Sequence, residues 1–234
     1  MTDRARRRWF ERYIETVLRR EVETATDLRR FDALVRMARL MVATTGSELF
    51  LTHLASDLGI DRSTAETYEP WIETTFLVHR VPAWSRRLAS KLVRRPRIHV
   101  CDTGLAAGVL GKDPGALSRP TEPATGPLVE SFVLAEIAKQ LTWFNTSARL
   151  HHLRESSGLE VDGLLEAPDG RVVAVEVKAT TVPRPADPAP MAIVRDRLDR
   201  LGSDFVAGVV FHTGDRCIPL SDRLVGLPLA DLWT

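Results

Sequence analysis

The stretch EVDGLLEAPDGRVVAVEVKA, residues 160–179, holds two runs rich in valine and leucine on either side of a Pro-Asp-Gly sequence. Glycine suits the left-handed position of a three-residue hairpin loop, so the pattern predicts two antiparallel strands joined at residues 168–170. Three ionisable residues interrupt the apolar pattern, namely Asp162, Glu176 and Lys178. Charged groups inside strands that otherwise resemble a protein core indicate a candidate site.

The loop length determines which of these side chains share a face of the sheet. A three-residue loop pairs Ala167 with Arg171, and counting back from this pair places Asp162 opposite Glu176. Side chains alternate across a strand, so Glu176 and Lys178 point to the same face. A two-residue loop would instead turn Asp162 to the other face. The composition of the loop therefore predicts that the three ionisable groups meet.

Two carboxylates that lie opposite each other repel, and a divalent cation offsets that repulsion. Mg²⁺ binds through a few carboxylates and completes its shell with water, whose pKa it lowers. We therefore expect Asp162 and Glu176 to be metal ligands for Mg²⁺, and Lys178 to assist the bound water near a phosphate. The alternative is a solvated polar face, on which a Glu and a Lys two residues apart are common.

A helix is predicted just before these strands, in the segment PLVESFVLAEIAKQL, because Pro127 suits the first position of a helix. Apolar residues at helical spacing share a face with Glu130 in its first turn, so we expect Glu130 to point inward and to support catalysis. Further strand and helix patterns predict a mixed α/β domain over residues 127–234. Residues 111–126, rich in Gly, Pro, Ser and Thr, form the predicted linker before it.

The first part of the chain has a helix-turn-helix pattern within residues 47–81, with a tight turn at Gly59. Strand-like runs at residues 77–81 and 97–101 follow it. A helix-turn-helix followed by a hairpin is a winged helix. We therefore predict a helical, winged-helix domain over residues 1–110.

The predicted wing is strongly basic. From Thr74 to Cys101 the chain has seven basic residues and no acidic one. Lysine and arginine side chains that contact phosphates each add a salt-dependent increment to nucleic-acid affinity. The candidate nucleic-acid contacts are Arg86, Arg87, Lys91, Arg94, Arg95 and Arg97. The alternative is a solvated hairpin whose arginines pair with acidic residues of the first helices.

Bulk properties exclude several other classes of protein. The net charge of +1 argues neither for nor against DNA as a partner. The two cysteines are far apart and form no CxxC motif, which argues against a disulfide framework. The N-terminal sequence lacks the apolar core of a signal peptide, and no apolar run is long enough to span a bilayer. We therefore expect a cytoplasmic protein without a membrane partner.

Several segments together resemble a known family. GPLVESFVLAEIAKQL, LHHLRESSGLEVDGLLE and VVAVEVKA are similar to the C-terminal region of bacterial and archaeal AAA-type ATPases, a region of unknown function. LASDLGIDRSTAETYEPWIETTFLVHRVPAW and RIHVCDTGLAAGVLG resemble the winged-helix segment of the same family. The Asp162, Glu176 and Lys178 pattern is similar to that of the PD-(D/E)xK nuclease superfamily. The resemblance implies a winged helix followed by a nuclease-like domain.

The chain departs from this family in one respect. Members usually carry an ATPase module ahead of these segments, whereas this sequence has no GxxxxGK[ST] loop. ATP binding is therefore not expected in this chain. Two functions remain open: a nucleic-acid-associated module that acts as a Mg²⁺-dependent nuclease, and a non-enzymatic accessory domain or truncated remnant that docks a protein partner, such as a separate ATPase chain.

Overall fold

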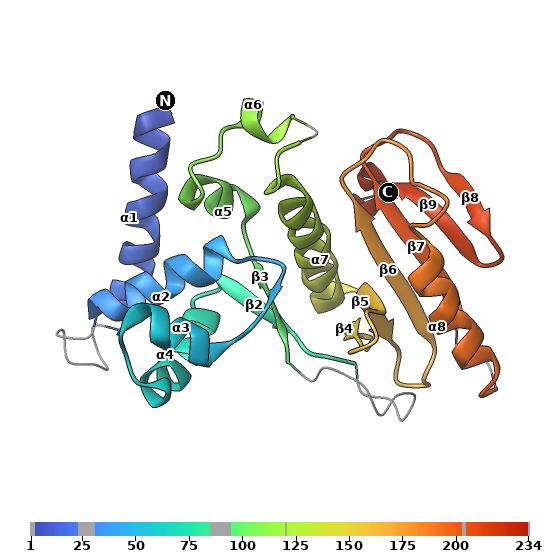
Figure 1. Ribbon diagram of the computed structural model, residues 1–234, viewed down its shortest axis with the longest axis horizontal. Coiled ribbons are helices and arrows are strands. Elements are labelled where there is room, and N and C mark those ends of the chain that lie inside the picture. Colours follow the sequence, from blue (N-terminus) through green and yellow to red (C-terminus); the bar gives the residue numbers. More distant parts are fainter. Residues whose placement is uncertain (1–2, 23–30, 85–94, 120, 203–204, 234) are drawn as a thin grey trace. The chain divides into compact units, whose positions relative to one another are not determined.

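The computed structural model describes residues 3–22, 31–84, 95–119, 121–202 and 205–233. The predicted mixed α/β class is confirmed, with a mixed six-stranded sheet in the C-terminal part (Figure 1). None of the helices in these ranges is long and apolar enough to cross a membrane.

The chain folds into two compact units, each built from two segments. The first unit contains Met1–Arg80 and Ile98–Phe132, and the second contains Val81–Arg97 and Val133–Thr234. Helix α7, Thr125–Trp143, therefore contributes its first residues to the first unit and the rest to the second. The described residues 81–84 and 95–97 of the predicted wing segment likewise belong to the second unit.

The first unit is mainly helical. Its helices are α1 (Asp3–Val22), α2 (Phe31–Ala43), α3 (Leu51–Leu58), α4 (Arg62–Thr74), α5 (Thr103–Val109) and α6 (Pro114–Leu117). Helix α3 is capped at its C-terminus by Gly59, whose φ of 65° is left-handed. Glycine adopts this conformation without the steric strain that a side chain would cause. This confirms the predicted tight turn between the two helices. Helix α6 falls within residues 111–126, where the sequence had suggested only a linker.

A three-stranded sheet accompanies these helices. Its strands are β1 (Ser47–Glu48), β2 (Val78–Val81) and β3 (Arg97–Val100), in the order β1-β3-β2. The strands β2 and β3 confirm the two strand-like runs predicted after the helix-turn-helix. The order along the chain is thus two helices, α3 and α4, followed by two paired strands.

A buried chain of hydrogen bonds links β3 to the start of α7 within the first unit. The Val100 backbone N–H donates to Thr45 Oγ1 at 2.9 Å, and this oxygen lies 2.7 Å from Ser131 Oγ. Ser131 Oγ lies in turn 3.0 Å from His99 Nδ1. The side chains of Ser131 and His99 have no exposed surface, so water does not replace a lost partner.

We expect Ser131→Ala to lower the free energy of unfolding by about 1–3 kcal/mol, because it removes the shared partner of Thr45 and His99. Thr142→Ala on the same helix is the control, since its exposed hydroxyl bonds only to the Lys139 carbonyl in what the structure describes. The control should change stability by less than about 0.5 kcal/mol. Urea unfolding measures both, and equal losses would contradict the importance of the buried chain.

The second unit is built on one mixed sheet. Its strands are β4 (Arg149–Arg154), β5 (Glu160–Glu166), β6 (Val172–Lys178), β7 (Phe205–His212), β8 (Ile218–Ser221) and β9 (Leu224–Pro228). They lie in the order β4-β5-β6-β7-β9-β8. Strands β4, β5 and β6 pair antiparallel, β6 with β7 and β7 with β9 pair parallel, and β8 returns antiparallel to β9. The short helix η2, Leu229–Trp233, follows β9.

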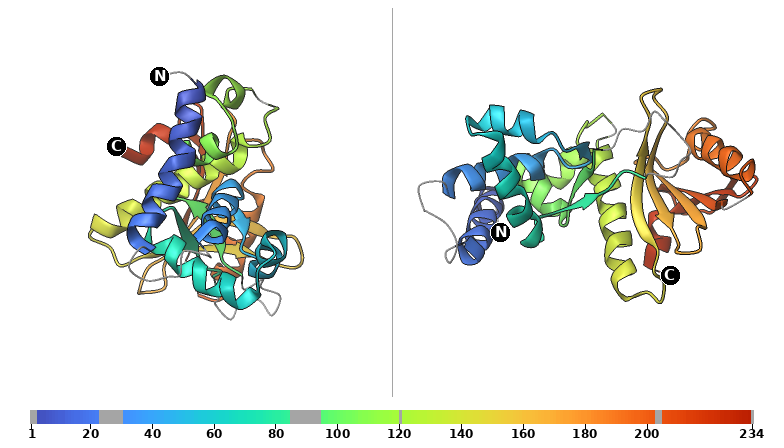
Figure 2. Two further views of the ribbon diagram at one scale, coloured as in Figure 1. Left: turned by 90° about the vertical axis from the view of Figure 1, so that its left-hand side faces the viewer. Right: turned by 90° about the horizontal axis from the view of Figure 1, so that it is seen from below.

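Helices cover both faces of this sheet (Figure 2). On one face, Met191 of α8 (Ala189–Asp199) is fully buried in a cluster with Ala174 and Val210. On the other face, a Cβ on Gly163 would lie 2.9 Å from a methyl group of Leu134 in α7. Because side chains alternate along a strand, residues of β5 and β6 face α8 and α7 in turn.

The hairpin between β5 and β6 has the predicted register. Leu165 pairs with Val173, and the Ala167 N–H donates to the Arg171 carbonyl at 2.9 Å. Gly170 has a φ of 88°. This is the left-handed conformation that the three-residue loop requires, so the prediction is confirmed.

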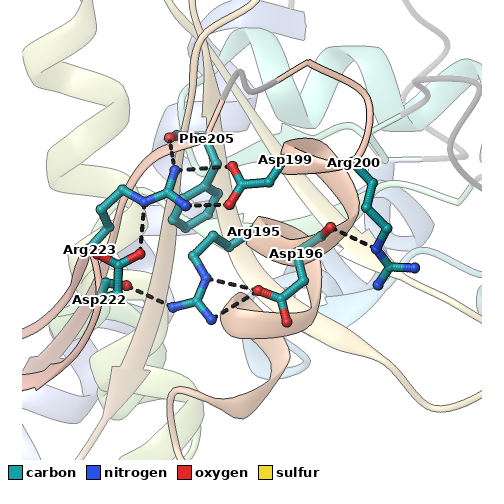
Figure 3. Close-up of polar contacts among 7 residues, drawn as sticks. All are labelled: Arg195, Asp196, Asp199, Arg200, Phe205, Asp222 and Arg223. Atoms are coloured by element: carbon teal, nitrogen blue, oxygen red, sulfur yellow. Dashed lines mark hydrogen bonds and ion pairs between the residues drawn. The ribbon is translucent and has the colours of Figure 1, made fainter.

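A network of arginines and aspartates holds the end of α8 against the turn between β8 and β9 (Figure 3). The Arg223 guanidinium donates to both oxygens of Asp199, to Asp222 Oδ2 at 3.2 Å and to the Phe205 carbonyl at 2.8 Å. Arg195 of α8 donates to the Asp222 carbonyl at 2.7 Å. These bonds fix the helix on the sheet face that also carries the predicted site.

Candidate functional site

The two predicted carboxylates and the lysine come together at the end of the β5–β6 ladder. Asp162 Oδ2 accepts the Val177 backbone N–H at 2.9 Å, and Glu176 Oε1 accepts a hydrogen bond from Lys178 Nζ at 2.6 Å. Both carboxylates are buried, whereas Lys178 is partly exposed. The β5–β6 register, continued by one pair, places Asp162 opposite Glu176.

Burial dominates the electrostatics of this pair. Burial, together with the neighbouring Asp162, raises the pKa of Glu176 to about 8 against the opposing effect of Lys178. Burial also raises the pKa of Asp162, although the Val177 N–H and Lys178 act in the other direction. Burial would lower the pKa of Lys178, but the adjacent Glu176 raises it overall. At pH 7 most Glu176 side chains therefore carry a proton and Lys178 is charged.

One oxygen of the pair lacks a hydrogen-bond partner in the part of the chain that the structure describes. Glu176 Oε2 is buried and has no hydrogen bond to any described residue. A buried polar atom without a partner is unfavourable unless a proton or a cation satisfies it. Within the described ranges, no group of three or more His, Cys, Asp or Glu side chains could hold a metal ion. A cation here would have two protein carboxylates and otherwise water, a ligand set that fits Mg²⁺.

Arg97 belongs to this cluster, although the sequence pattern had grouped it with nucleic-acid contacts. Only 4% of its side chain is exposed, it forms an ion pair with Glu160, and its Nη1 lies 3.7 Å from Asp162 Oδ1. Glu160 also accepts a hydrogen bond from Arg154 Nη1 at 2.8 Å. This burial places the Arg97 guanidinium among carboxylates rather than on a surface that could bind phosphates.

The other predicted nucleic-acid contacts divide into two groups. Four lie outside the described residues and stay predictions: Arg86, Arg87, Lys91 and Arg94. Arg95 is exposed, and its carbonyl accepts a hydrogen bond from His152 Nε2 at 2.8 Å. Arg80, at the start of the basic stretch, pairs instead with Glu69 and Glu73 of α4. Arg80 therefore follows the alternative to phosphate binding, in which arginines of the basic stretch pair with acidic residues of the helices.

Both described ends of the basic stretch are attached to the second unit. The Trp84 N–H donates to the His152 carbonyl at 2.7 Å, and the His152 N–H donates to the Pro82 carbonyl at 2.9 Å. Trp84 Nε1 also donates to Glu166 at 3.0 Å. At the other end, the His152 ring binds Arg95 as described above. His152 thus binds both described ends of this stretch beside β4.

Glu130 lies in the part of α7 that belongs to the first unit. Its Oε2 lies 3.8 Å from the position that a Cβ on Gly46 would take. Asp162, Glu176 and Lys178 lie in the second unit. The supporting role of Glu130 stays a prediction.

His212 borders the site, although no motif in the sequence points to it. In the parallel β6–β7 register His212 lies beside Lys178. Its ring is fully buried, and Nδ1 accepts the Gly214 N–H at 3.1 Å, so the proton is on Nε2. This Nε2 has no hydrogen-bond partner among the described residues. The pairing of strands far apart in the sequence, rather than any local motif, brings His212 here.

Comparison with known proteins finds that each part of the chain is similar to a domain family of unknown function. Residues 1–116 match the family model described as "Domain of unknown function (DUF8612)", and residues 125–232 match "Domain of unknown function (DUF4143)". The second half of the chain is thus similar to DUF4143 domains. These domains are commonly found with AAA ATPases, which confirms the coarser part of the predicted resemblance.

Two curated relatives cover almost the whole chain. They are uncharacterised proteins of Mycobacterium bovis and Mycobacterium tuberculosis, each 29% identical over 227 residues. The match covers 97% of this chain but 48% of each relative, so the chain spans about half of their length. No solved structure matches.

Proposed function

We propose that the second unit is a nuclease-like domain that binds Mg²⁺ and acts on the phosphodiester bonds of DNA. The observation that carries this proposal is the buried carboxylate pair of Asp162 and Glu176, in which one Glu176 oxygen lacks a hydrogen-bond partner among the described residues. Lys178 lies beside it with its ammonium group partly exposed. Two carboxylates and a lysine on adjacent strands are the groups that the PD-(D/E)xK pattern requires.

Each group has a distinct part in this proposal. Asp162 and Glu176 would hold Mg²⁺, which when bound lowers the pKa of a coordinated water. Lys178 keeps its positive charge because Glu176 stabilises it, so its exposed part can attract a phosphate group. Because Asp162 and Glu176 are buried, bulk water has limited access to the two carboxylates. Glu130 is the proposed supporting residue.

The helix-turn-helix of the first unit and the basic stretch that follows β2 would provide contact with DNA. The helices α3 and α4 followed by β2 and β3 have the order of a winged helix, which supports that assignment. In the sequence, the stretch between β2 and β3 is rich in lysine and arginine. Phosphate contacts by such residues would strengthen binding in a salt-dependent manner.

A second candidate function is a non-enzymatic accessory domain that docks a protein partner, such as an ATPase chain. It is favoured by the balance of charge around the site, where three basic side chains accompany three carboxylates. They are Arg97, Arg154 and Lys178 with Glu160, Asp162 and Glu176. Side chains alone can therefore neutralise the cluster, and the fold is compatible with a role that needs no metal.

Titration calorimetry with Mg²⁺ and Mn²⁺ at pH 9, where Glu176 is ionised, distinguishes these functions. We expect saturable binding by the wild type and a loss of affinity of at least about tenfold in Asp162→Asn and in Glu176→Gln, since each removes a charged ligand. Asp169→Asn is the control, because this exposed carboxylate lies in the loop of the same hairpin and pairs with Arg171. Its affinity should equal that of the wild type.

Cleavage of labelled DNA with Mg²⁺ then tests the chemistry. Lys178→Met should retain cation binding and lose cleavage. If the wild type binds the cation but does not cleave DNA, the proposed metal site stands and the proposed nuclease activity is contradicted. Absence of cation binding in the wild type and in every variant would contradict the proposal and favour the accessory domain.

A further inference from the structure

Arg97 brings a permanent positive charge to the candidate metal site. It is the first residue of β3, and 4% of its side chain is exposed. Guanidinium groups stay protonated in proteins at any ordinary pH. The charge beside Asp162 is therefore present whether or not the carboxylates are ionised.

The position of this charge opposes a cation on Asp162. One oxygen of Asp162, Oδ2, accepts the Val177 N–H, and the other, Oδ1, faces Arg97 Nη1 at 3.7 Å. A cation bound through Oδ1 would lie close to the guanidinium, and like charges repel strongly where water is scarce. The cation and Arg97 therefore compete for the same oxygen.

A second carboxylate provides Arg97 with another partner. Glu160 forms an ion pair with Arg97 and binds Arg154 with its other oxygen. When Asp162 takes up a cation, the guanidinium can remain on Glu160 without leaving the cluster. Glu160 thus makes the exchange between arginine and cation possible without exposing an unpaired buried charge.

We infer that Arg97 is an internal counter-ion that positions Asp162 when no cation is bound and lowers the affinity of the site for divalent cations. This inference rests on the proposed metal site and adds its regulation. It assigns to Arg97 a positioning role through Asp162, distinct from direct contact with a phosphate. Any change that draws Arg97 away from Asp162 strengthens cation binding.

Calorimetric titration of the full chain with Mn²⁺ at pH 9 tests this role. Arg97→Gln should bind Mn²⁺ about tenfold more tightly, which is the effect of a unit charge roughly 6 Å from a divalent ion even with the screening of bulk water. Arg97→Lys keeps the charge and should restore an affinity near that of the wild type. Arg154→Gln is the matched control: its side chain is 43% exposed and it binds the same Glu160, so the affinity should change by less than about threefold.

Glu160→Gln changes the cluster without altering Arg97 and gives an effect of opposite sign. With one carboxylate fewer, the guanidinium should hold Asp162 more strongly, and Mn²⁺ binding should weaken several-fold. Thermal unfolding with and without Mn²⁺ provides the affinity even for a less stable variant, because a ligand that binds only the folded state stabilises it by an amount set by the ratio of ligand concentration to Kd. A purely structural Arg97 would lower stability without raising affinity.

The outcomes separate the inference from the function on which it rests. If the wild type binds Mn²⁺ and Arg97→Gln binds it with equal or weaker affinity, the inference is overturned and the proposed metal site stands. Absence of Mn²⁺ binding in the wild type and in all variants would overturn both. The inference is supported if Arg97→Gln binds Mn²⁺ more tightly than the wild type and Glu160→Gln binds it more weakly.

Discussion

Glu176→Gln is expected to make the protein more stable at pH 9 and to remove most of its loss of stability with rising pH, when divalent cations are absent. The folded-state pKa of Glu176 is about 8, against 4.5 for an exposed glutamate. Below pH 4.5 both states are protonated and the group has no effect. Between these values only the unfolded state releases the proton, which stabilises the unfolded state and lowers the free energy of unfolding. Above pH 8 the full penalty, roughly 3–5 kcal/mol, is present.

Glutamine retains the shape of the protonated side chain and cannot ionise. Urea unfolding at pH 5, 7 and 9 should therefore show a falling free energy of unfolding for the wild type and a much flatter one for Glu176→Gln. Asp169→Asn serves as a control, since its hydrogen bonds with Arg171 lower the pKa of this exposed carboxyl and its ionisation is complete well below pH 7. Parallel curves for the wild type and Glu176→Gln would show that Glu176 ionises normally in the folded protein.

The same measurement links stability to the proposed function. A carboxylate that destabilises the fold at high pH is retained more readily when its charge serves a site. If Asp162 and Glu176 bind a cation, Mg²⁺ at pH 9 should recover the lost stability of the wild type. It should have little effect on Glu176→Gln, in which the ligand is missing. The gain would report cation binding independently of calorimetry.

The part of the site that the sequence predicts correctly is local. The Pro-Asp-Gly loop and the alternation of side chains lie within a single hairpin, so the loop length alone determines that Asp162 and Glu176 meet. The helix-turn-helix was predictable for the same reason, since Gly59 and two short amphipathic helices are adjacent in the sequence. Local turn chemistry and periodicity are what a sequence displays most directly.

The parts that the sequence did not predict depend on distant pairings. Arg97 reaches Glu160 from 63 residues away, and nothing near it distinguishes it from the neighbouring arginines. His212 joins the site because β7 pairs in parallel with β6, which no local pattern specifies. Strand β9 gives only a weak signal in the sequence, because its run is short and contains Gly226 and Pro228, which do not favour a strand.

The loop after β6, which follows Lys178 directly, packs closely against the loop after β7. The Thr213 N–H donates to the Thr180 carbonyl at 2.9 Å. A Cβ on Gly214 would lie 2.1 Å from the Thr181 carbonyl oxygen and 3.0 Å from His212 Nδ1. Because the closest obstacle is backbone, a rotation of a side chain cannot relieve the contact, and one of the two loops must move.

Gly214→Ala is therefore expected to lower the free energy of unfolding by about 3 kcal/mol, the upper range for overpacking a closely packed site. Gly126→Ala in α7 is the control, because nothing lies within 4 Å of its added Cβ and alanine favours a helix. Its stability should equal or exceed that of the wild type. Urea unfolding compares them, and similar values for both variants would contradict the tight packing of the two loops. Since the loop that must move begins beside Lys178, Gly214→Ala should also weaken Mg²⁺ binding at pH 9, whereas Gly126→Ala should not.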